Sequence, residues 1–199
     1  MTPAIHHSAE HFGSAAEVYE RGRPGYRSEV VAYIADTLDL RPGRVVVDLA
    51  AGTGKLTREL VPTGADVIAV EPVAGMRDQL TAVLPGVDVR DGTAEAMPLA
   101  DGAADAVTVA QAFHWFRGDE ALAEISRVLR PGGRLLLAWN RRDLNDPLNG
   151  AISELVEEHR GDTPAHATGK WREVFSRTEL FGPLHEVQLP GTEQWVDAD

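Results

Sequence analysis

The sequence predicts an α/β fold, in which a doubly wound, mostly parallel sheet carries helices on both faces. Three observations predict it: short apolar runs recur along the 199 residues, segments of helical period separate them, and Gly, Pro or Asp bounds each run. Strands buried on both faces need nearly unbroken apolar runs. Regular alternation of strand and helix is typical of a parallel, Rossmann-like sheet.

Five strands are expected before residue 144. Each is short, rich in Val and Leu, and without polar alternation, as a strand between two helical layers requires. The expected strands are Val45–Val47 with Leu49, Val67–Val70, Val87 with Val89, Ala106–Ala110 and Leu135–Trp139.

Helices are expected where apolar residues recur three or four positions apart and so share one face. Pro and Gly in Arg41–Gly43 and in Arg130–Gly133 end two of these helices and return the chain to a strand. The shared faces are Val30, Ile34 and Leu38; Met76, Leu80 and Val83; and Leu122, Ile125 and Leu129.

The pattern changes in the last quarter of the chain. Asp146 and Pro147 resemble a helix N-cap followed by Pro in the first turn, and Leu148, Ile152 and Leu155 would form that helix's apolar face. The sequence further predicts a short helix, a sixth strand and an edge segment, over Lys170–Phe175, Leu184–Leu189 and Gln194–Val196 respectively.

Composition predicts a single domain over residues 1–199 and restricts its partners. The net charge of −12 repels nucleic acid and anionic membranes, which favours a small-molecule partner. The absence of cysteine excludes disulfides and thiol catalysis. With no apolar run of membrane-spanning length and no secretion signal, we expect a cytoplasmic protein. His6, His7 and His11 lack a carboxylate partner, so no metal site is expected.

A glycine loop, Asp48–Gly54, follows the first strand and leads into a helix. This context is typical of nucleotide-binding loops, where glycine lets the backbone approach the ligand. A phosphate-binding P-loop is excluded because Leu49 and Leu56 replace its required Gly and Ser or Thr. The dinucleotide fingerprint also fits poorly, since Thr57 stands where it needs a small residue. Glu71 ends the second strand beside this loop, where a carboxylate accepts hydrogen bonds from a ribose diol.

From Phe12 to about Asp143 the chain resembles the small-molecule branch of the class I methyltransferases, the type 11 family that includes trans-aconitate methyltransferase-like proteins. The first motif is matched except that Ala50 replaces its first glycine, and an alanine there is crowded only if the backbone needs a positive φ. The matching blocks are Asp48–Gly54, Glu71, Gly92–Pro98, Val109–Phe116 and Arg127–Gly133.

The resemblance implies S-adenosyl-L-methionine as cofactor and S-adenosyl-L-homocysteine as product. It divides the chain into an N-terminal tail and lid (1–28), a cofactor-binding core (41–143) and a C-terminal part (144–199). The implied cofactor-binding residues are Tyr19, Arg23, Asp48, Ala50, Ala51, Gly52, Gly54, Glu71, Pro72, Met76, Thr93, Ala94, Glu95, Gln111, Ala112 and His114.

Acceptor contacts are expected from the lid and from the ends of the fourth and fifth strands. His114 is the candidate general base, or else a cofactor contact. Arg141 and Arg142 follow the fifth strand, where a guanidinium would grip a carboxylate. Tyr26, Trp115 and Trp139 complete the expected substrate-binding set, whereas Trp171 and Phe175 are expected to anchor a helix.

The sequence therefore predicts methyl transfer from S-adenosyl-L-methionine to an O-, N- or C-nucleophile of a small molecule. Two alternatives stay open: an NAD(P)-dependent oxidoreductase and a non-catalytic cofactor-binding subunit. The family's sheet ends in an antiparallel hairpin, and the sequence predicts no seventh strand after Leu184–Leu189. We expect either a truncated chain or a homodimer in which the partner adds a strand.

Overall fold

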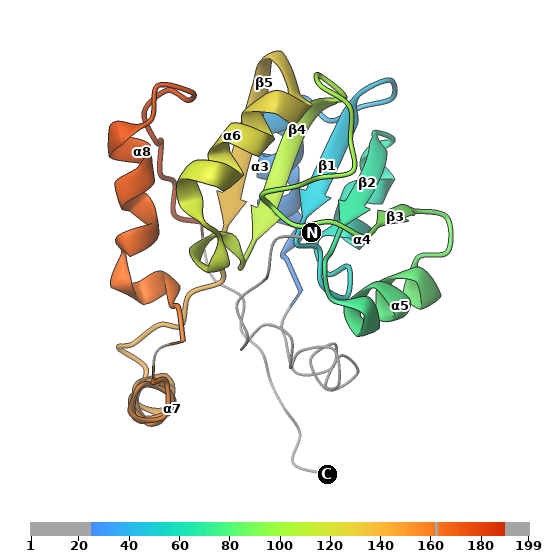
Figure 1. Ribbon diagram of the computed structural model, residues 1–199. Helices are drawn as coiled ribbons and strands as arrows, with labels where there is room; N and C mark the ends of the chain where they lie inside the picture. The colour runs from blue at the N-terminus through green and yellow to red at the C-terminus, as the bar shows by residue number, and fades with distance from the viewer. Residues whose placement is uncertain (1–24, 162, 190–199) are drawn as a thin grey trace.

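A computed structural model describes residues 25–161 and 163–189 and contains one sheet of five parallel strands (Figure 1). The order β3-β2-β1-β4-β5 confirms the α/β fold and its doubly wound connectivity. The order reverses between β1 and β4, the place where ligands of such sheets bind. The strands are β1 (Val45–Leu49), β2 (Asp66–Val70), β3 (Asp88–Arg90), β4 (Ala104–Ala110) and β5 (Leu129–Ala138).

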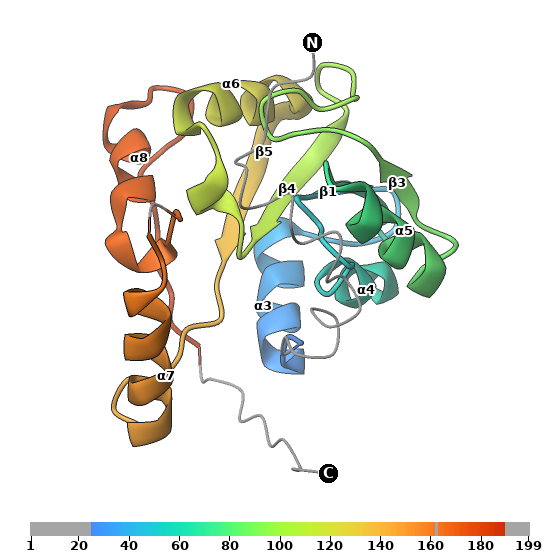
Figure 2. The same ribbon diagram turned by 60° about the horizontal axis from the view of Figure 1, so that its bottom comes forward.

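Helices cover both faces of the sheet, with α6 on one side and α3 with α4 on the other (Figure 2). Successive side chains of a strand point to opposite faces, so β1 contributes Val46 to one core cluster and Val47 and Leu49 to the other. The helices of the first half are α3 (Ser28–Leu38), α4 (Thr57–Leu60), η2 (Val61–Thr63), α5 (Ala74–Val83), η3 (Phe113–Trp115) and α6 (Gly118–Val128).

The parallel register brings the carboxyl ends of the strands to one edge. Leu49 is paired with Val70 of β2 and with Val109 of β4, and Val109 is paired with Leu137 of β5. The segments that follow these strands therefore begin side by side. Most of the described residues predicted to bind the cofactor lie in these segments. The two exceptions are Asp48, which is within β1, and Met76, which is in α5.

Two details of the predicted helices were wrong. Leu129 is the first residue of β5 rather than part of α6, and the predicted turn Arg130–Gly133 lies within β5, where the pairing with β4 shifts register. Val83 belongs to α5 as expected, but its side chain is 39% exposed, because Met76 and Leu80 are the α5 residues that reach the interior.

The C-terminal part lies beyond the β5 edge of the sheet (Figure 1). The predicted cap of α7 is confirmed, since the Asn149 amide donates to the Asp146 carboxylate over 2.8 Å. The predicted short helix at residues 170–175 forms as η5 and α8. The elements here are α7 (Pro147–Glu158), η4 (His166–Thr168), η5 (Lys170–Arg172) and α8 (Glu173–Arg177).

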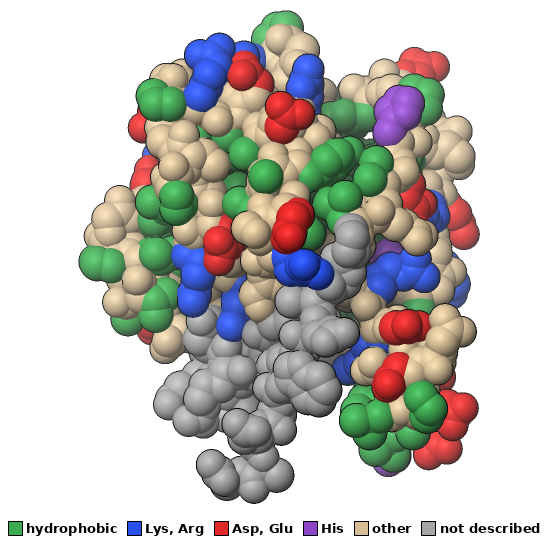
Figure 3. Space-filling model, turned by 180° about the vertical axis from the view of Figure 1, so that it is seen from behind, with side chains coloured by type: hydrophobic (Ala, Val, Ile, Leu, Met, Phe, Trp, Pro, Cys, Tyr) green, Lys and Arg blue, Asp and Glu red, His purple; other side chains and the backbone are tan. Residues whose placement is uncertain are grey.

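The apolar face predicted for α7 is not buried. Leu148 and Leu155 are 69% and 58% exposed, and the helix has no buried residue. Figure 3 shows hydrophobic side chains gathered at the lower right, where α7 lies. The periodicity identified the helix correctly, but no described element covers this face.

The predicted sixth strand at Leu184–Leu189 was wrong. These residues pair with no strand in the described chain, and Leu184 and Val187 are largely exposed. A strand needs a neighbour to satisfy its backbone and cover its side chains. Gln194–Val196 lies outside the described residues.

Candidate functional site

The first residue of the glycine loop, Asp48, has a buried and hydrogen-bonded carboxylate. Asp48 is 1% exposed, and its two carboxylate oxygens accept from the hydroxyls of Thr57, over 2.6 Å, and of Thr108, over 3.1 Å. Burial raises the pKa of Asp48 to about 6, an effect that the two hydroxyls partly offset. The pair of hydrogen bonds joins β1 to the first turn of α4 and to β4.

Thr57 and Thr108 were not predicted as site residues. In the sequence Thr57 is notable only as a departure from the dinucleotide fingerprint, whereas in the structure its hydroxyl lies 2.6 Å from the Asp48 carboxylate. A Thr one turn after a glycine loop that begins with Asp is the only sequence signal for this contact. Thr108 lies in the neighbouring strand, so strand order had to be known first.

Backbone strain marks both sides of the switch point. Ala50 follows β1 with φ 55°, and Gln111 follows β4 with φ 61°. L-residues other than Gly, Asn and Asp rarely adopt this region, and such conformations cluster at ligand sites. Ala50 thus occupies the strained geometry in which the family's glycine costs least, so this departure from the motif has an energetic consequence.

The carboxylate of Glu71 closes the loop from the β2 side. One oxygen accepts from the amide of Gly52 over 2.9 Å and the other from the amide of Val73 over 2.8 Å. Burial raises its pKa, and the nearby charge of Asp48 acts in the same direction, while Arg77 opposes it. Glu71 and the glycine loop, predicted as neighbours, are in direct contact.

The two loop glycines have different roles. A Cβ on Gly54 would stand 2.9 Å from Cγ of Leu80, so this glycine allows α5 to approach the loop. A Cβ on Gly52 would have no described atom within 4 Å, and its φ is 58°. The backbone of Gly52 therefore has free space beside it, next to Glu71, as close contact with a ligand requires. Pro72 follows Glu71 in the chain, and Met76 is buried in α5 below the loop.

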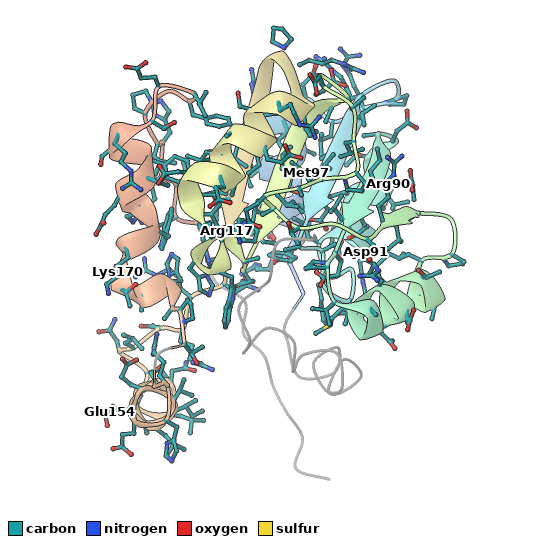
Figure 4. All side chains as sticks on the ribbon, in the orientation of Figure 1. Arg90, Asp91, Met97, Arg117, Glu154 and Lys170 are labelled. Atoms are coloured by element: carbon teal, nitrogen blue, oxygen red, sulfur yellow. The ribbon has the colours of Figure 1, made fainter. Side chains whose placement is uncertain are left out.

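The segment after β3 forms a tight turn at the same edge. Thr93 and Ala96 form an antiparallel bridge, and Ala94 and Thr93 are buried. The Thr93 hydroxyl has no hydrogen-bond partner among the described residues. The Glu95 carboxylate accepts from the backbone amide of Arg117 over 2.9 Å. Arg117 precedes the first residue of α6 and is labelled in Figure 4. Glu95 thus connects this turn to α6 by a hydrogen bond, whereas the buried hydroxyl of Thr93 makes none with the described residues.

An aromatic group lies after β4 and β5. His114 is in η3 beside Trp115, with ring centroids 5.5 Å apart, and the indole Nε1 of Trp139 donates to its Nδ1 over 3.5 Å. Trp139 stacks on Trp171 and His166, with centroid distances of 4.4 and 4.5 Å. His166 was not predicted.

The structure brings together much of the predicted acceptor set. Arg141 and Arg142 are exposed in the loop after Trp139. Tyr26 packs against the α3 core cluster, and Asn140 donates to the carbonyl of Gly25 over 3.4 Å, so the start of α3 lies beside the end of β5. Tyr19 and Arg23 lie outside the described residues.

The anchoring role predicted for Trp171 and Phe175 is confirmed. Phe175 and Trp171 lie 5.2 and 6.3 Å from the ring of the buried Phe113. Val174, between them, is 4% exposed. This contact is the main attachment of α8 to the core.

The described part of the chain has neither a membrane-spanning helix nor a metal-binding cluster. None of its helices has the length and hydrophobicity needed to cross a membrane. Within the same residues, no three His, Asp or Glu side chains are grouped so that they would bind a metal ion. The N-terminal histidines lie outside this part.

Comparison with known proteins agrees with the geometry. The methyltransferase domain family matches residues 47–137. An uncharacterized methyltransferase of Mycobacterium tuberculosis is 52% identical over 66% of this chain and 53% of its own length. A methyltransferase-like protein of Schizosaccharomyces pombe is 39% identical over 86% of this chain and 67% of its own length. The chain thus spans about half the length of the mycobacterial relative.

A solved structure has a similar fold. The YcgJ protein of Bacillus subtilis superimposes with a TM-score of 0.58 at 24% identity, over 75% of this chain and 67% of that protein. The fold and the site place the glycine loop, the Glu71 carboxylate and two strained residues together at the switch point of a parallel sheet. The chain belongs to the class I S-adenosyl-L-methionine-dependent methyltransferases, as the sequence resemblance predicted.

Proposed function

We propose that this chain binds S-adenosyl-L-methionine at the carboxyl ends of β1, β2 and β4 and transfers its methyl group to a small-molecule acceptor. The observation that carries the proposal is Glu71, which holds the amide of Gly52 while the Cα of Gly52 faces open space. A carboxylate beside an open glycine loop at a switch point suits the ribose of a nucleoside cofactor.

The residues present fit this cofactor. The buried Thr93 hydroxyl without a partner in the described chain needs a hydrogen bond that a ligand would supply. Each Glu71 oxygen has a second lone pair for a ribose hydroxyl. Ala50, Ala51 and Gln111 provide backbone at the pocket edge. When bound, S-adenosyl-L-methionine supplies a sulfonium methyl group open to in-line attack, and positioning is the protein's main contribution.

We further propose that the acceptor is a small carboxylic acid. Arg141 and Arg142 follow the end of β5, at the rim next to Trp139, where a planar guanidinium would bind a carboxylate with two hydrogen bonds. A carboxylate is already ionised at neutral pH, so its methylation needs no proton removal. The net charge of −12 supports a small molecule rather than nucleic acid.

Calorimetric titration of the ligand-free chain tests the cofactor. We expect S-adenosyl-L-methionine and S-adenosyl-L-homocysteine to bind and NAD not to bind. Glu71→Ala removes two buried acceptors and should weaken binding on the order of 100-fold. Glu154→Ala, on the distant helix α7, is the matched control. Binding of NAD alone would instead support an oxidoreductase, and an unchanged affinity in Glu71→Ala would contradict the proposed pocket.

Acceptor class is tested with methyl-labelled S-adenosyl-L-methionine and three matched compounds: benzoate, benzyl alcohol and benzylamine. Label transfer to benzoate, reduced in Arg141→Gln, would support a carboxylate acceptor. Transfer to the alcohol or the amine alone would contradict it. Cofactor binding without transfer to any of them would favour the alternative of a non-catalytic binding subunit.

A further inference from the structure

The indole of Trp139 determines which nitrogen of His114 can carry a proton. Its Nε1 lies 3.5 Å from Nδ1 of His114. An indole N–H is a donor only, so Nδ1 must be the acceptor in this contact. A neutral imidazole has one protonated and one unprotonated nitrogen. With Nδ1 accepting, the proton of neutral His114 is on Nε2.

Aromatic neighbours hold the indole in that orientation. Trp171 and His166 lie 4.4 and 4.5 Å from the Trp139 ring, and the two lie 5.4 Å from each other. Trp171 is itself oriented, because its Nε1 donates to the carbonyl of His166 over 3.2 Å. The three rings form a compact stack that restricts rotation of Trp139.

The surroundings of these rings disfavour protonation of His166. Burial lowers the pKa of His166, and the positive charges of Arg141 and Arg172 lower it further, while Glu186 opposes them. Arg172 lies over the Trp171 ring, 4.5 Å from its centroid, and pairs with Glu186 over 2.9 Å. The lowered pKa favours the uncharged imidazole of His166 beside the Trp139 ring.

This tautomer changes what His114 can do. The nitrogen that could accept a proton, Nδ1, faces the indole, whereas Nε2 already carries one. From the sequence, His114 is a candidate general base for a hydroxyl or protonated amine. A base must have its lone pair directed at the proton it removes.

We propose that Trp139 is a positioning residue that fixes His114 as the Nε2–H tautomer, so that His114 donates a hydrogen bond from Nε2 and does not act as the base. Its consequence for catalysis rests on the proposed methyl transfer: the acceptor atom must be able to attack without losing a proton to His114. The tautomer itself is a property of the chain alone and is measured without cofactor or acceptor.

The test is a long-range proton–nitrogen correlation spectrum of the full chain labelled with ¹⁵N-histidine, at about pH 8, where imidazole is neutral. The chain has 7 histidines, so the His114 signals are assigned by their loss in His114→Gln. We expect wild-type His114 to be almost entirely the Nε2–H form. A His114 protonated mainly on Nδ1 would overturn the proposal.

Two matched variants identify the cause. Trp139→Phe keeps an aromatic ring but removes the N–H, and should shift His114 to a mixture of tautomers. Trp171→Phe removes the neighbouring indole N–H, which bonds His166 instead, and should leave His114 unchanged. An unchanged tautomer in Trp139→Phe would overturn the role of Trp139. Failure to bind S-adenosyl-L-methionine would refute the proposed function while the spectra still decide the tautomer.

Discussion

The cofactor-binding core and the C-terminal part of this chain use their apolar residues differently. In β1 and β4 most side chains are buried, and α6 buries four residues against the sheet. In α7 none is buried, and Leu148 is 69% exposed. The core folds around its own interior, whereas the C-terminal part is attached chiefly through Trp171, Val174 and Phe175. Apolar periodicity therefore indicates helix formation, but burial depends on what lies opposite.

Charged groups differ in the same way. Asp48 and Glu71 are buried and bonded to hydroxyl or amide groups of the site. On the C-terminal part, Arg177 and Asp119 form an exposed pair at 2.6 Å that links α8 to α6. Exposed pairs contribute little to stability, since solvent screens them. The buried carboxylates of the described chain therefore lie in the core, at the candidate site.

The largest expected effect concerns the buried Asp48. Its pKa of about 6 lies above the ordinary 3.8, so the folded chain binds more protons than the unfolded chain between these values. Its contribution to stability is full below about pH 4 and is lost as pH rises through 6. A rise of that size corresponds to about 3 kcal/mol. In Asp48→Asn this fall in the free energy of unfolding should disappear.

Urea unfolding from pH 4 to pH 7 measures this difference. Glu71 also has a raised pKa, so the fall in stability that it causes, in the same direction, should remain in the variant. Asp119→Asn removes an exposed carboxylate whose pKa is lowered by Arg177, and should leave the fall between pH 4 and pH 6 in place. A pH profile of Asp48→Asn identical to wild type would refute the assignment.

The second effect separates the two regions directly. Phe175→Ala removes a half-buried ring that packs 5.2 Å from Phe113, and should cost about 2 kcal/mol. Hydrogen exchange should rise in residues 163–189 and remain slow in β1 and β4. Leu180→Ala, at a 51% exposed position of the same segment, is the control and should change little. Loss of protection throughout the sheet would show that the two regions are one cooperative unit.

A smaller effect is expected at Ala50. Its φ of 55° strains an alanine, so Ala50→Gly should raise the free energy of unfolding by about 1 kcal/mol. Ala51→Gly lies in the same loop, where Ala51 does not have a positive φ, and should lower stability instead. Thermal unfolding of both variants measures the contrast. Equal destabilisation by the two glycines would contradict strain at residue 50.

The smallest effect is expected on α7. Leu148→Ser combined with Leu155→Ser should change the free energy of unfolding by less than about 0.5 kcal/mol, because both side chains are mostly exposed. Leu122→Ser, in the buried face of α6, is the contrasting variant and should be severely destabilising. Chemical unfolding with light scattering measures both. A large loss in the α7 variant would show that this face is covered in solution, and light scattering would show whether a second copy covers it.

Much of the fold could be predicted because it depends on local patterns. The apolar runs at residues 45–49 and 106–110 identified strands β1 and β4, and Asp146 identified the start of α7. Leu184–Leu189 carries apolar residues at positions 184, 187 and 189 and forms no strand. A strand requires a partner, and a single run of residues carries no information about whether one is present.

The candidate site divides in the same manner. The glycine loop and Glu71 were predicted because a strand, a tight turn and an acid at the next strand end occur in a recognisable order. The bonds from Thr57 and Thr108 to Asp48 were not, although Thr57 is only nine residues away in the chain. Both threonine side chains are short, so whether their hydroxyls reach Asp48 depends on the final orientation of each strand and helix.

The sequence alone determined the class of fold, the location of the cofactor loop and the membership in a family, because these follow from residue types at fixed spacing along the chain. Packing determined the strain at Ala50 and Gln111, the burial of Asp48 and the contact between Trp139 and His114. Each of these joins or positions groups from separate elements. Their geometry exists only once the strand order β3-β2-β1-β4-β5 has brought those elements together.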